Sequence, residues 1–227
     1  MRDFERQLAL IRQRITRAAD ASNRDPNDIT ILAVTKTASP NDLRLAWDCG
    51  QREFAHNRIE GLERGREILP DAEWHMIGRL QGKKVKKAWG CMDGLHSYDR
   101  SSLGERLNRA GEEFGGPPLK IWVQVALQAD EERSGCPLDK ADILIREMTA
   151  HSHLAVQGLM AMGPNPASDK KPENVFRAVS KASARLSEKG LLPCRYSTSM
   201  GMSNDLETAI AEGATLLRIG RALFPPK

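Results

Sequence analysis

The sequence lacks any long apolar stretch. No hydrophobic run approaches the roughly 20 residues that a helix needs to cross a bilayer. The N-terminus, Met1 to Arg6, carries acidic residues where a secretory signal peptide needs a basic segment followed by an apolar one. These absences predict a protein without a leader or a membrane anchor, and we expect it in the cytoplasm.

Cysteine is scarce and scattered. Cys49, Cys91, Cys136 and Cys194 are far apart in the chain and form no CxxC pair. Spacings of this kind do not suit zinc, so we expect no metal ligands. Reduced and mostly buried cytosolic thiols are the simplest interpretation.

A strong charge of one sign is also missing. The chain has 34 basic and 30 acidic residues, a formal net charge of +4, and only 5% aromatic residues. This mild excess suits an anionic ligand but lacks the clustered Arg and aromatic residues of a nucleic-acid-binding protein. One basic run, Lys83–Lys87, stands out, and a solvated helix face explains it better than a nucleic-acid patch. A basic binding module is therefore kept only as the third functional alternative.

The chain is instead rich in alternating helical and strand patterns. Phe4, Leu8, Ile11 and Ile15 recur at helical spacing, which predicts an N-terminal helix over about residues 3–21. Short β-branched runs and amphipathic segments then alternate to the end of the chain. The expected strands are 29–34, 53–55, 73–77, 93–97, 119–127, 154–160, 195–198 and 215–219. The expected helices between them begin at Ser39-Pro40 and then cover 58–69, 83–89, 101–114, 138–150, 171–189 and 205–212.

Eight strands that alternate with helices predict an α/β fold with a parallel sheet. Because the chain has 227 residues, close to the ~250 typical of a (β/α)₈ barrel, we expect one TIM-barrel domain over residues 1–227. An open doubly wound sheet is the competing architecture. Its glycine fingerprint is absent after the first strand, where Lys36 stands, so the closed barrel is favoured.

Two stretches near the end of the chain could bind an anion. Tyr196 to Asp205 and Leu216 to Arg221 each read as a strand followed by a turn of small residues. Phosphate commonly binds in the loops after the seventh and eighth strands of such barrels. Backbone N–H groups at these turns would form an anion cup, and Gly201 and Gly220 would let the backbone approach a ligand. The alternative is an ordinary turn whose helix is capped by Ser203 or Asn204.

A lysine and an arginine complete the candidate site. Strand alternation places Lys36 on the same side as Leu32 and Val34, toward the barrel interior, where its amine could form a Schiff base. A lysine that reaches solvent at the strand end is the alternative. Arg218 is a permanent cation in an apolar run. It either pairs with a carboxylate on a neighbouring strand or donates a hydrogen bond to a ring nitrogen of a ligand.

The motifs that carry a family resemblance follow one another along nearly the whole chain. They are Ala33-Val34-Thr35-Lys36-Thr37, His75-Met76-Ile77-Gly78-Arg79-Leu80-Gln81, Ser134-Gly135, Gly158-Leu159-Met160-Ala161-Met162, Ser199-Met200-Gly201-Met202-Ser203-Asn204-Asp205 and Arg218-Ile219-Gly220. In these motifs the chain resembles the pyridoxal phosphate homeostasis proteins, also called proline synthetase co-transcribed homologues. They are single-domain relatives of the alanine racemase N-terminal barrel, the fold type III barrel of pyridoxal 5'-phosphate (PLP) proteins.

The resemblance implies a PLP-binding protein that buffers and releases the cofactor inside the cell. PLP would be held as an imine on Lys36, with its phosphate on the Ser199–Ser203 turn and the Gly220 turn and with Arg218 facing the pyridine nitrogen. The implied cofactor-binding residues are Lys36, Asn57, Ser199, Gly201, Met202, Ser203, Arg218 and Gly220, with no catalytic residues. The resemblance also implies a monomer that passes PLP to apo-enzymes.

The chain departs from the family pattern after the second strand. Ala55-His56-Asn57-Arg58 stands where the family typically has Gly-Glu-Asn-Tyr, so only Asn57 is kept. A small PLP-dependent racemase or lyase is therefore the main alternative function, with His56, His75 or a water as the proton carrier. Against it, the chain stops at Phe224-Pro225-Pro226-Lys227, before any second domain such as the one that supplies a tyrosine in alanine racemase.

Overall fold

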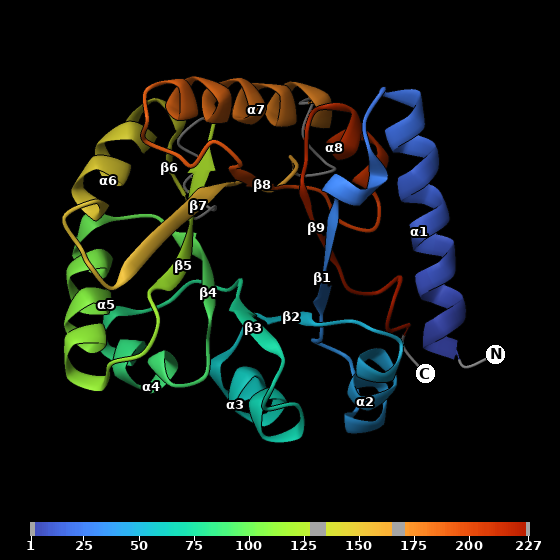
Figure 1. Cartoon of the computed structure of the whole chain (residues 1–227), viewed down its shortest axis with the longest axis horizontal. Coiled ribbons are helices and arrows are strands. Elements are labelled where there is room, and N and C mark those ends of the chain that lie inside the picture. Colours follow the sequence, from blue (N-terminus) through green and yellow to red (C-terminus); the bar gives the residue numbers. More distant parts are fainter. Residues whose placement is uncertain (1–2, 128–134, 165–170, 226–227) are drawn as a thin grey trace.

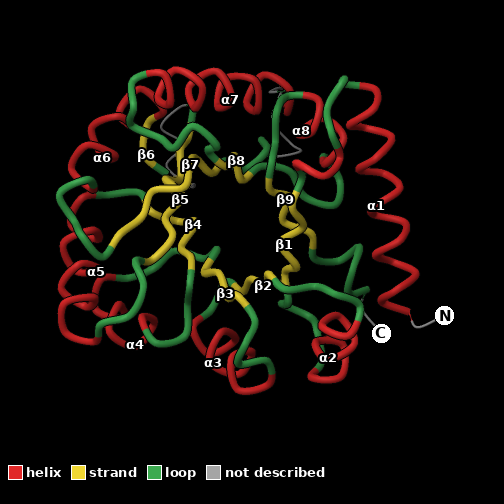
Figure 2. The backbone as a smooth tube through the Cα atoms, in the orientation of Figure 1, coloured by secondary structure: helices red, strands yellow, loops and turns green. Residues whose placement is uncertain are grey.

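Eight parallel strands form a closed ring in the computed structural model, which describes residues 3–127, 135–164 and 171–225. Neighbouring strands follow the order β4-β3-β2-β1-β9-β8-β7-β5, and a pairing of β4 with β5 closes the ring (Figures 1 and 2). The predicted barrel is confirmed. Ser134, Pro226 and Lys227 lie outside the described residues. The strands are β1 Thr30–Val34, β2 Glu53–His56, β3 Glu73–Met76, β4 Gly94–Tyr98, β5 Leu119–Ala126, β7 Leu154–Met160, β8 Ser197–Ser199 and β9 Leu216–Ile219, and a two-residue strand, β6 Cys136–Pro137, pairs with the end of β5.

Helices surround the ring on its outer side (Figure 1). Their boundaries agree with the expected ones to within a few residues. Ser39 begins the second helix with a capping box, since its hydroxyl accepts from Asp42 N and Asp42 Oδ2 accepts from Ser39 N. No described helix has the length and apolar character needed to cross a membrane. The helices are α1 Asp3–Ala21, α2 Pro40–Asp48, α3 Ile59–Ile68, α4 Val85–Trp89, α5 Ser101–Phe114, α6 Ala141–Met148, α7 Pro172–Glu188 and α8 Leu206–Ala211.

The N-terminal helix α1 lies outside the barrel and packs against α8 (Figure 1). Two arginines fasten this contact at opposite ends of α8. Arg14 binds the Glu207 carboxylate through Nε and Nη2, at 2.6 and 2.8 Å. Arg24 Nη1, just after α1, donates to the carbonyls of Ile210 and Ala214, at 2.7 and 2.8 Å. The first helix therefore holds the last one in place.

The strands separate two cores. One lies between strands and helices, and the other fills the ring with Leu32, Val34, Ala55, Trp122, Met160 and Leu216. Strand alternation decides the side, because residues two apart point the same way. Polar residues share the interior with this apolar set: His75 and His96 contact Trp122, and Arg218 lies two residues after Leu216. The interior is thus partly polar, which sets up the candidate site.

Strands β7 and β8 approach each other closely at Gly158. A Cβ at Gly158 in β7 would overlap the carbonyl oxygen of Ser197 in the paired strand β8. We expect Gly158→Ala to lower the free energy of unfolding by about 3 kcal/mol, the range found for overpacked cores. Urea denaturation measures this loss. The control is Gly90→Ala, where a Cβ meets nothing within 4 Å; equal stability of the two variants would contradict the register of β7 and β8.

Candidate functional site

The strand register gathers the expected site residues at one mouth of the barrel. Val34 of β1 pairs with Ala55 of β2, and Ala33 pairs with Ile219 of β9. Lys36, Asn57 and Gly220 follow these pairs by one or two residues. Since the carboxyl ends of parallel strands meet at one edge, the three residues lie at the same mouth. Polar functional groups of such barrels usually lie at this end.

Lys36 lies in a turn after β1 and is exposed. Leu32 and Val34 do face the interior, and Lys36 follows the end of the strand with its side chain accessible to solvent rather than enclosed in the barrel. The amine lies close enough to His56 to influence it. Burial lowers the pKa of His56, and the positive charges of Lys36, Arg58 and Arg64 lower it further. The divergent segment at the end of β2 therefore places a neutral imidazole near the lysine.

The turn after β8 is shaped by packing beneath it. Gly201 has φ +85°, and a Cβ there would lie 2.6 Å from Ala209 Cβ and 2.9 Å from Leu217 Cδ2. Glycine is required at this position because the chain itself leaves no space, which differs from the expected reason of ligand approach. At Gly220 a Cβ would meet only Val34, at 3.4 Å. This second turn is the more open of the two.

Several hydrogen bonds fix the backbone of the turn after β8. Arg218 N donates to Gly201 O at 3.0 Å, Met202 N donates to Asp205 Oδ1 at 2.6 Å, and Arg14 Nη2 donates to Ser203 O at 3.0 Å. The N-cap residue of α8 is Asp205, so the alternative of capping by Ser203 or Asn204 is wrong. The Met202 side chain is 37% exposed at the mouth.

Arg218 is buried in the ring, with 6% of its surface exposed. Nη1 donates to the carbonyl and the hydroxyl oxygens of Ser199, at 2.5 and 2.8 Å, and Nη2 donates to Ala161 O at 2.9 Å. Hydrogen bonds to the ends of β8 and β7, rather than a salt bridge, hold this cation within the described chain. Burial lowers the pKa of Arg218 to about 10, although nearby Asp205 acts to raise it. The guanidinium is therefore still charged at neutral pH.

Two buried histidines lie behind Ser199. His96 Nδ1 is 2.9 Å from Ser199 Oγ, and His96 Nε2 is 2.9 Å from His75 Nδ1. The indole of Trp122 stacks on His96 at a centroid distance of 4.0 Å. From the sequence, both histidines could equally be core residues or point into the site. They are hydrogen-bonded core residues that connect to the site through Ser199. The sequence signal was that His75 lies two residues after Glu73, so their side chains face the same side of β3.

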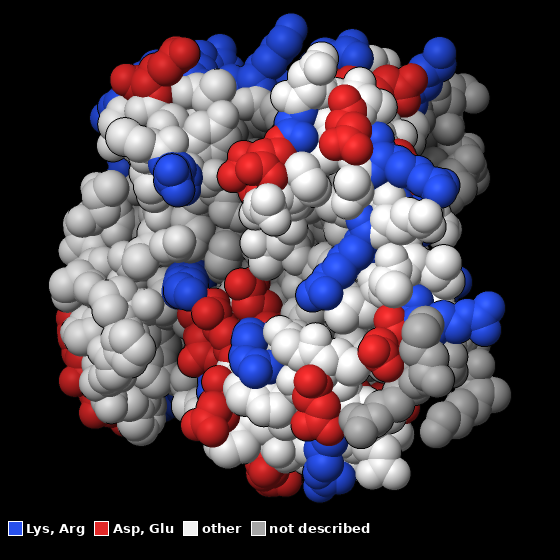
Figure 3. All heavy atoms as spheres, turned by 45° about the vertical axis from the view of Figure 1, so that its right-hand side comes forward, with Lys and Arg blue, Asp and Glu red and all other residues white. Residues whose placement is uncertain are grey.

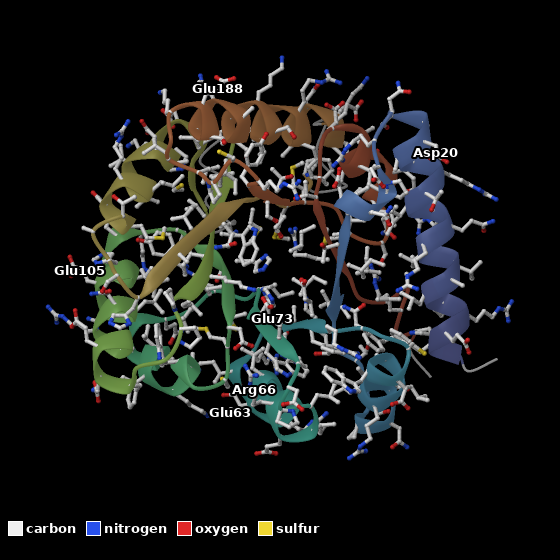
Figure 4. The ribbon with its side chains drawn as sticks, viewed as in Figure 1. Asp20, Glu63, Arg66, Glu73, Glu105 and Glu188 are labelled. Atoms are coloured by element: carbon white, nitrogen blue, oxygen red, sulfur yellow. The ribbon has the colours of Figure 1, made fainter. Side chains whose placement is uncertain are left out.

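A cluster of charged residues lies at the opposite mouth, where the strands begin. Glu73, which Figure 4 shows at the inner edge of the ring, accepts from Lys120 Nζ at 2.7 and 2.8 Å. His75 Nε2 lies 2.9 Å from Glu73 Oε1, although its N–H is not well aligned with that oxygen. The contact with His75, and then Lys120, lowers the pKa of Glu73 to about 2. Burial raises the pKa of neighbouring Glu53.

The basic run Lys83–Lys87 is partly neutralised by acidic neighbours. Lys86 Nζ lies 2.6 Å from a Glu113 oxygen, and Lys87 Nζ lies 3.1 Å from a Glu63 oxygen. On the face that carries α1, basic and acidic side chains are interspersed as well (Figure 3). These pairs favour the solvated helix face over a nucleic-acid surface. No group of three or more possible metal-ligating side chains occurs among the described residues.

Comparison with known proteins agrees with this geometry. Residues 7–226 match the family described as alanine racemase, N-terminal domain. The pyridoxal phosphate homeostasis protein of Escherichia coli K12 is 36% identical over 232 residues, which cover 99% of this chain and 97% of that protein. That of Pseudomonas aeruginosa PAO1 is 37% identical over 222 residues, or 96% and 93% of the two chains. This chain belongs to the pyridoxal phosphate homeostasis protein family.

Solved structures extend the family comparison. PipY from Synechococcus elongatus PCC7942, solved without and with PLP, superposes with TM-scores of 0.80 and 0.78 at 32% and 31% identity. These superpositions cover 92% and 93% of this chain and 99% of PipY. Alanine racemase from Clostridium difficile 630 has a TM-score of 0.72 at 11% identity, which shows a shared fold over 56% of that enzyme.

The contacts of Glu73 with His75 and Lys120 predict that the free energy of unfolding falls at acid pH. The pKa of Glu73 is lowered from 4.5 to about 2, so the unfolded chain binds more protons between these values. Stability is therefore fully present above pH 4.5 and is lost as pH falls toward 2. We expect the advantage of the wild type over Glu73→Gln, about 2 kcal/mol at neutral pH, to shrink in that window.

Thermal unfolding between pH 2 and pH 7 measures the effect. The control is Glu105→Gln, on the outer side of α5 (Figure 4). An advantage over Glu73→Gln that stays constant with pH would show that Glu73 is not held as a carboxylate.

Proposed function

We propose that this chain binds PLP at the carboxyl-end mouth of the barrel and buffers the intracellular supply of the cofactor. The observation that carries the proposal is the convergence of Lys36, the Ser199–Ser203 turn, Arg218 and Gly220 at one mouth. The family supports it, since its members are named for PLP homeostasis and PipY was solved with PLP bound. We assign the site to Lys36, Asn57, Ser199, Gly201, Met202, Ser203, Arg218 and Gly220.

The residues present fit the chemistry of this cofactor. Arg218 is a buried cation at the mouth, and within the described residues no carboxylate is bonded to it, so it suits an acceptor such as a ring nitrogen. The turn at Gly220 offers backbone for a phosphate, whereas the N–H of Met202 is already bonded to Asp205 Oδ1. The exposed amine of Lys36 is accessible to an aldehyde arriving from solvent. Bound PLP supplies that aldehyde and an electron-withdrawing ring.

The same residues favour a carrier over a strong catalyst. Arg218 keeps its proton at neutral pH, so it donates a hydrogen bond without protonating the ring nitrogen. PLP enzymes that use the ring as an electron sink typically place an acidic partner there. Lys36 is open to water and to other amines, which favours reversible loading. Both features suit storage and release.

The Lys36 assignment predicts a covalent label. After incubation with PLP and reduction by borohydride, we expect the wild type to carry one cofactor per chain on Lys36, because its amine faces the mouth. Lys36→Ala should lose this label at least tenfold. Mass spectrometry of the digested protein measures it.

The matched control is Lys189→Ala, which removes an exposed lysine just after α7 and before β8 begins, toward the end of the barrel opposite the mouth. Labelling that persists in Lys36→Ala at the wild-type level would refute the assignment of Lys36.

A racemase or lyase activity is the second candidate function, and one observation favours it. His56 lies near Lys36, and its Nδ1 accepts from Arg58 N at 3.0 Å, so the neutral ring carries its proton on Nε2 and could donate it at the mouth. His75 is only 1% exposed and does not suit this role. If the activity exists, solvent deuterium should enter Cα of an added amino acid and His56→Ala should lower the rate at least tenfold. No incorporation across a panel of L- and D-amino acids would remove this candidate.

We further propose that the protein is a cytoplasmic monomer that delivers PLP to apo-enzymes. The four cysteines are all free thiols, with Cys194 exposed rather than buried as expected, which suits a reducing compartment. Light scattering checks the mass in solution. Transfer of PLP from the loaded protein to an apo-enzyme, faster than free PLP alone permits, checks delivery.

A further inference from the structure

A continuous line of polar contacts crosses the interior of the barrel. It begins at Lys120 and Glu73 at one mouth, passes through His75 and His96, and ends at Ser199 and Arg218 at the other mouth. Each contact is between 2.7 and 2.9 Å long. The line joins β5, β3, β4, β8 and β9. It connects the candidate PLP site with a charged cluster that no part of the proposed function uses.

With neutral rings, the ionised carboxylate at the Glu73 end sets the direction of the hydrogen bonds along the line. Glu73 can only accept, so the proton of His75 belongs on Nε2, which lies 2.9 Å from Glu73 Oε1 in a polar contact that is poorly aligned for a hydrogen bond. A neutral His75 then accepts at Nδ1, which requires a proton on His96 Nε2. His96 Nδ1 must accept in turn from the Ser199 hydroxyl. Ser199 Oγ is left with lone pairs, one of which accepts from Arg218.

The surroundings of His96 are consistent with a neutral ring. Burial lowers the pKa of His96 well below its usual value, and the charge of Arg218 acts in the same direction. Trp122 covers one face of the His96 ring. The charged groups near His75 are Glu73 on β3, Glu53 on β2 and Lys120 on β5. The two carboxylates lie at the Glu73 end of the line.

We propose that Glu73, His75 and His96 form a proton-ordered relay that orients the Ser199 hydroxyl and, through it, Arg218. The three are positioning residues for the mouth, acting from the opposite end of the barrel. The order runs from Arg218 to Ser199, His96 and His75, each donating to the next, and ends at the close polar contact of His75 Nε2 with Glu73. Only the final link, from Arg218 to the cofactor, rests on the proposed function.

The relay predicts that a substitution at Glu73 changes which ring nitrogen carries the proton in both His75 and His96. In Glu73→Gln, Lys120 occupies the amide oxygen, so the amide nitrogen donates to His75 Nε2. His75 must then carry its proton on Nδ1 and donate to His96, and the His96 proton also moves to Nδ1. The hydroxyl of Ser199 loses its acceptor. One substitution thus reverses two hydrogen bonds that it does not touch.

Nitrogen-15 NMR of the imidazole rings in the cofactor-free protein tests this order. The chain has five histidines, so single His→Asn variants of His56, His151 and His153 identify the signals of His75 and His96 by exclusion. In the wild type we expect both to be neutral with the proton on Nε2. An imidazolium signal, or a proton on Nδ1 of either ring, would overturn the relay without any change to the two buried histidines.

The variants add the second half of the test. Glu73→Gln should move the proton of both rings to Nδ1, whereas Glu53→Gln, at the paired position of β2, should leave both on Nε2. A change confined to His75 would overturn the relay. With PLP added, the switch should shift the absorption maximum of the bound cofactor. An unshifted maximum would overturn the link to Arg218, while failure of the wild type to bind PLP would refute only the proposed function.

Discussion

A guanidinium inside a barrel must find acceptors, and the acceptors of Arg218 organise the mouth. They come from Ser199 at the end of β8 and Ala161 just after β7, so one side chain fastens three neighbouring strand ends. Among the described residues no carboxylate is bonded to the cation, so no bonded anion neutralises its charge. The desolvation cost of such a group is several kcal/mol. The residues around it are arranged to make that cost tolerable.

Hydrogen bonds from outside the barrel also stabilise the mouth around Arg218. The turn after β8 is tied to β9 through the Arg218 backbone and to α1 through Arg14. Arg24 satisfies carbonyls at the far end of α8, a helix too short to be stable alone. These hydrogen bonds tie the turns of the site to the neighbouring strand and helix. Rigid support of this kind is what a ligand site requires.

Local patterns in the sequence predicted the barrel well, because alternation and turn residues are encoded within short windows. Strand order predicted Lys36, Asn57, Arg218 and Gly220 at one mouth, and the register brings the ends of β1, β2 and β9 together there. The sequence left open whether Lys36 is enclosed or reaches solvent, because exposure depends on the residues that surround the turn after β1. The bond between His96 and Ser199 joins residues 103 positions apart and depends on the closure of the ring. No local pattern carries such information, so the polar interior had to be seen in three dimensions.

The pairing of β1 with β9 also has a consequence for how the chain is made. The strand that carries the Lys36 turn leaves the ribosome early, but its partner is encoded within the last dozen residues. Helix α1 likewise waits for α8. Both must remain without their final neighbours while nearly all of the chain is synthesised, and such long-range closure is slow. The mouth that gathers Lys36 and Gly220 is therefore completed only after the segment that carries β9 has left the ribosome.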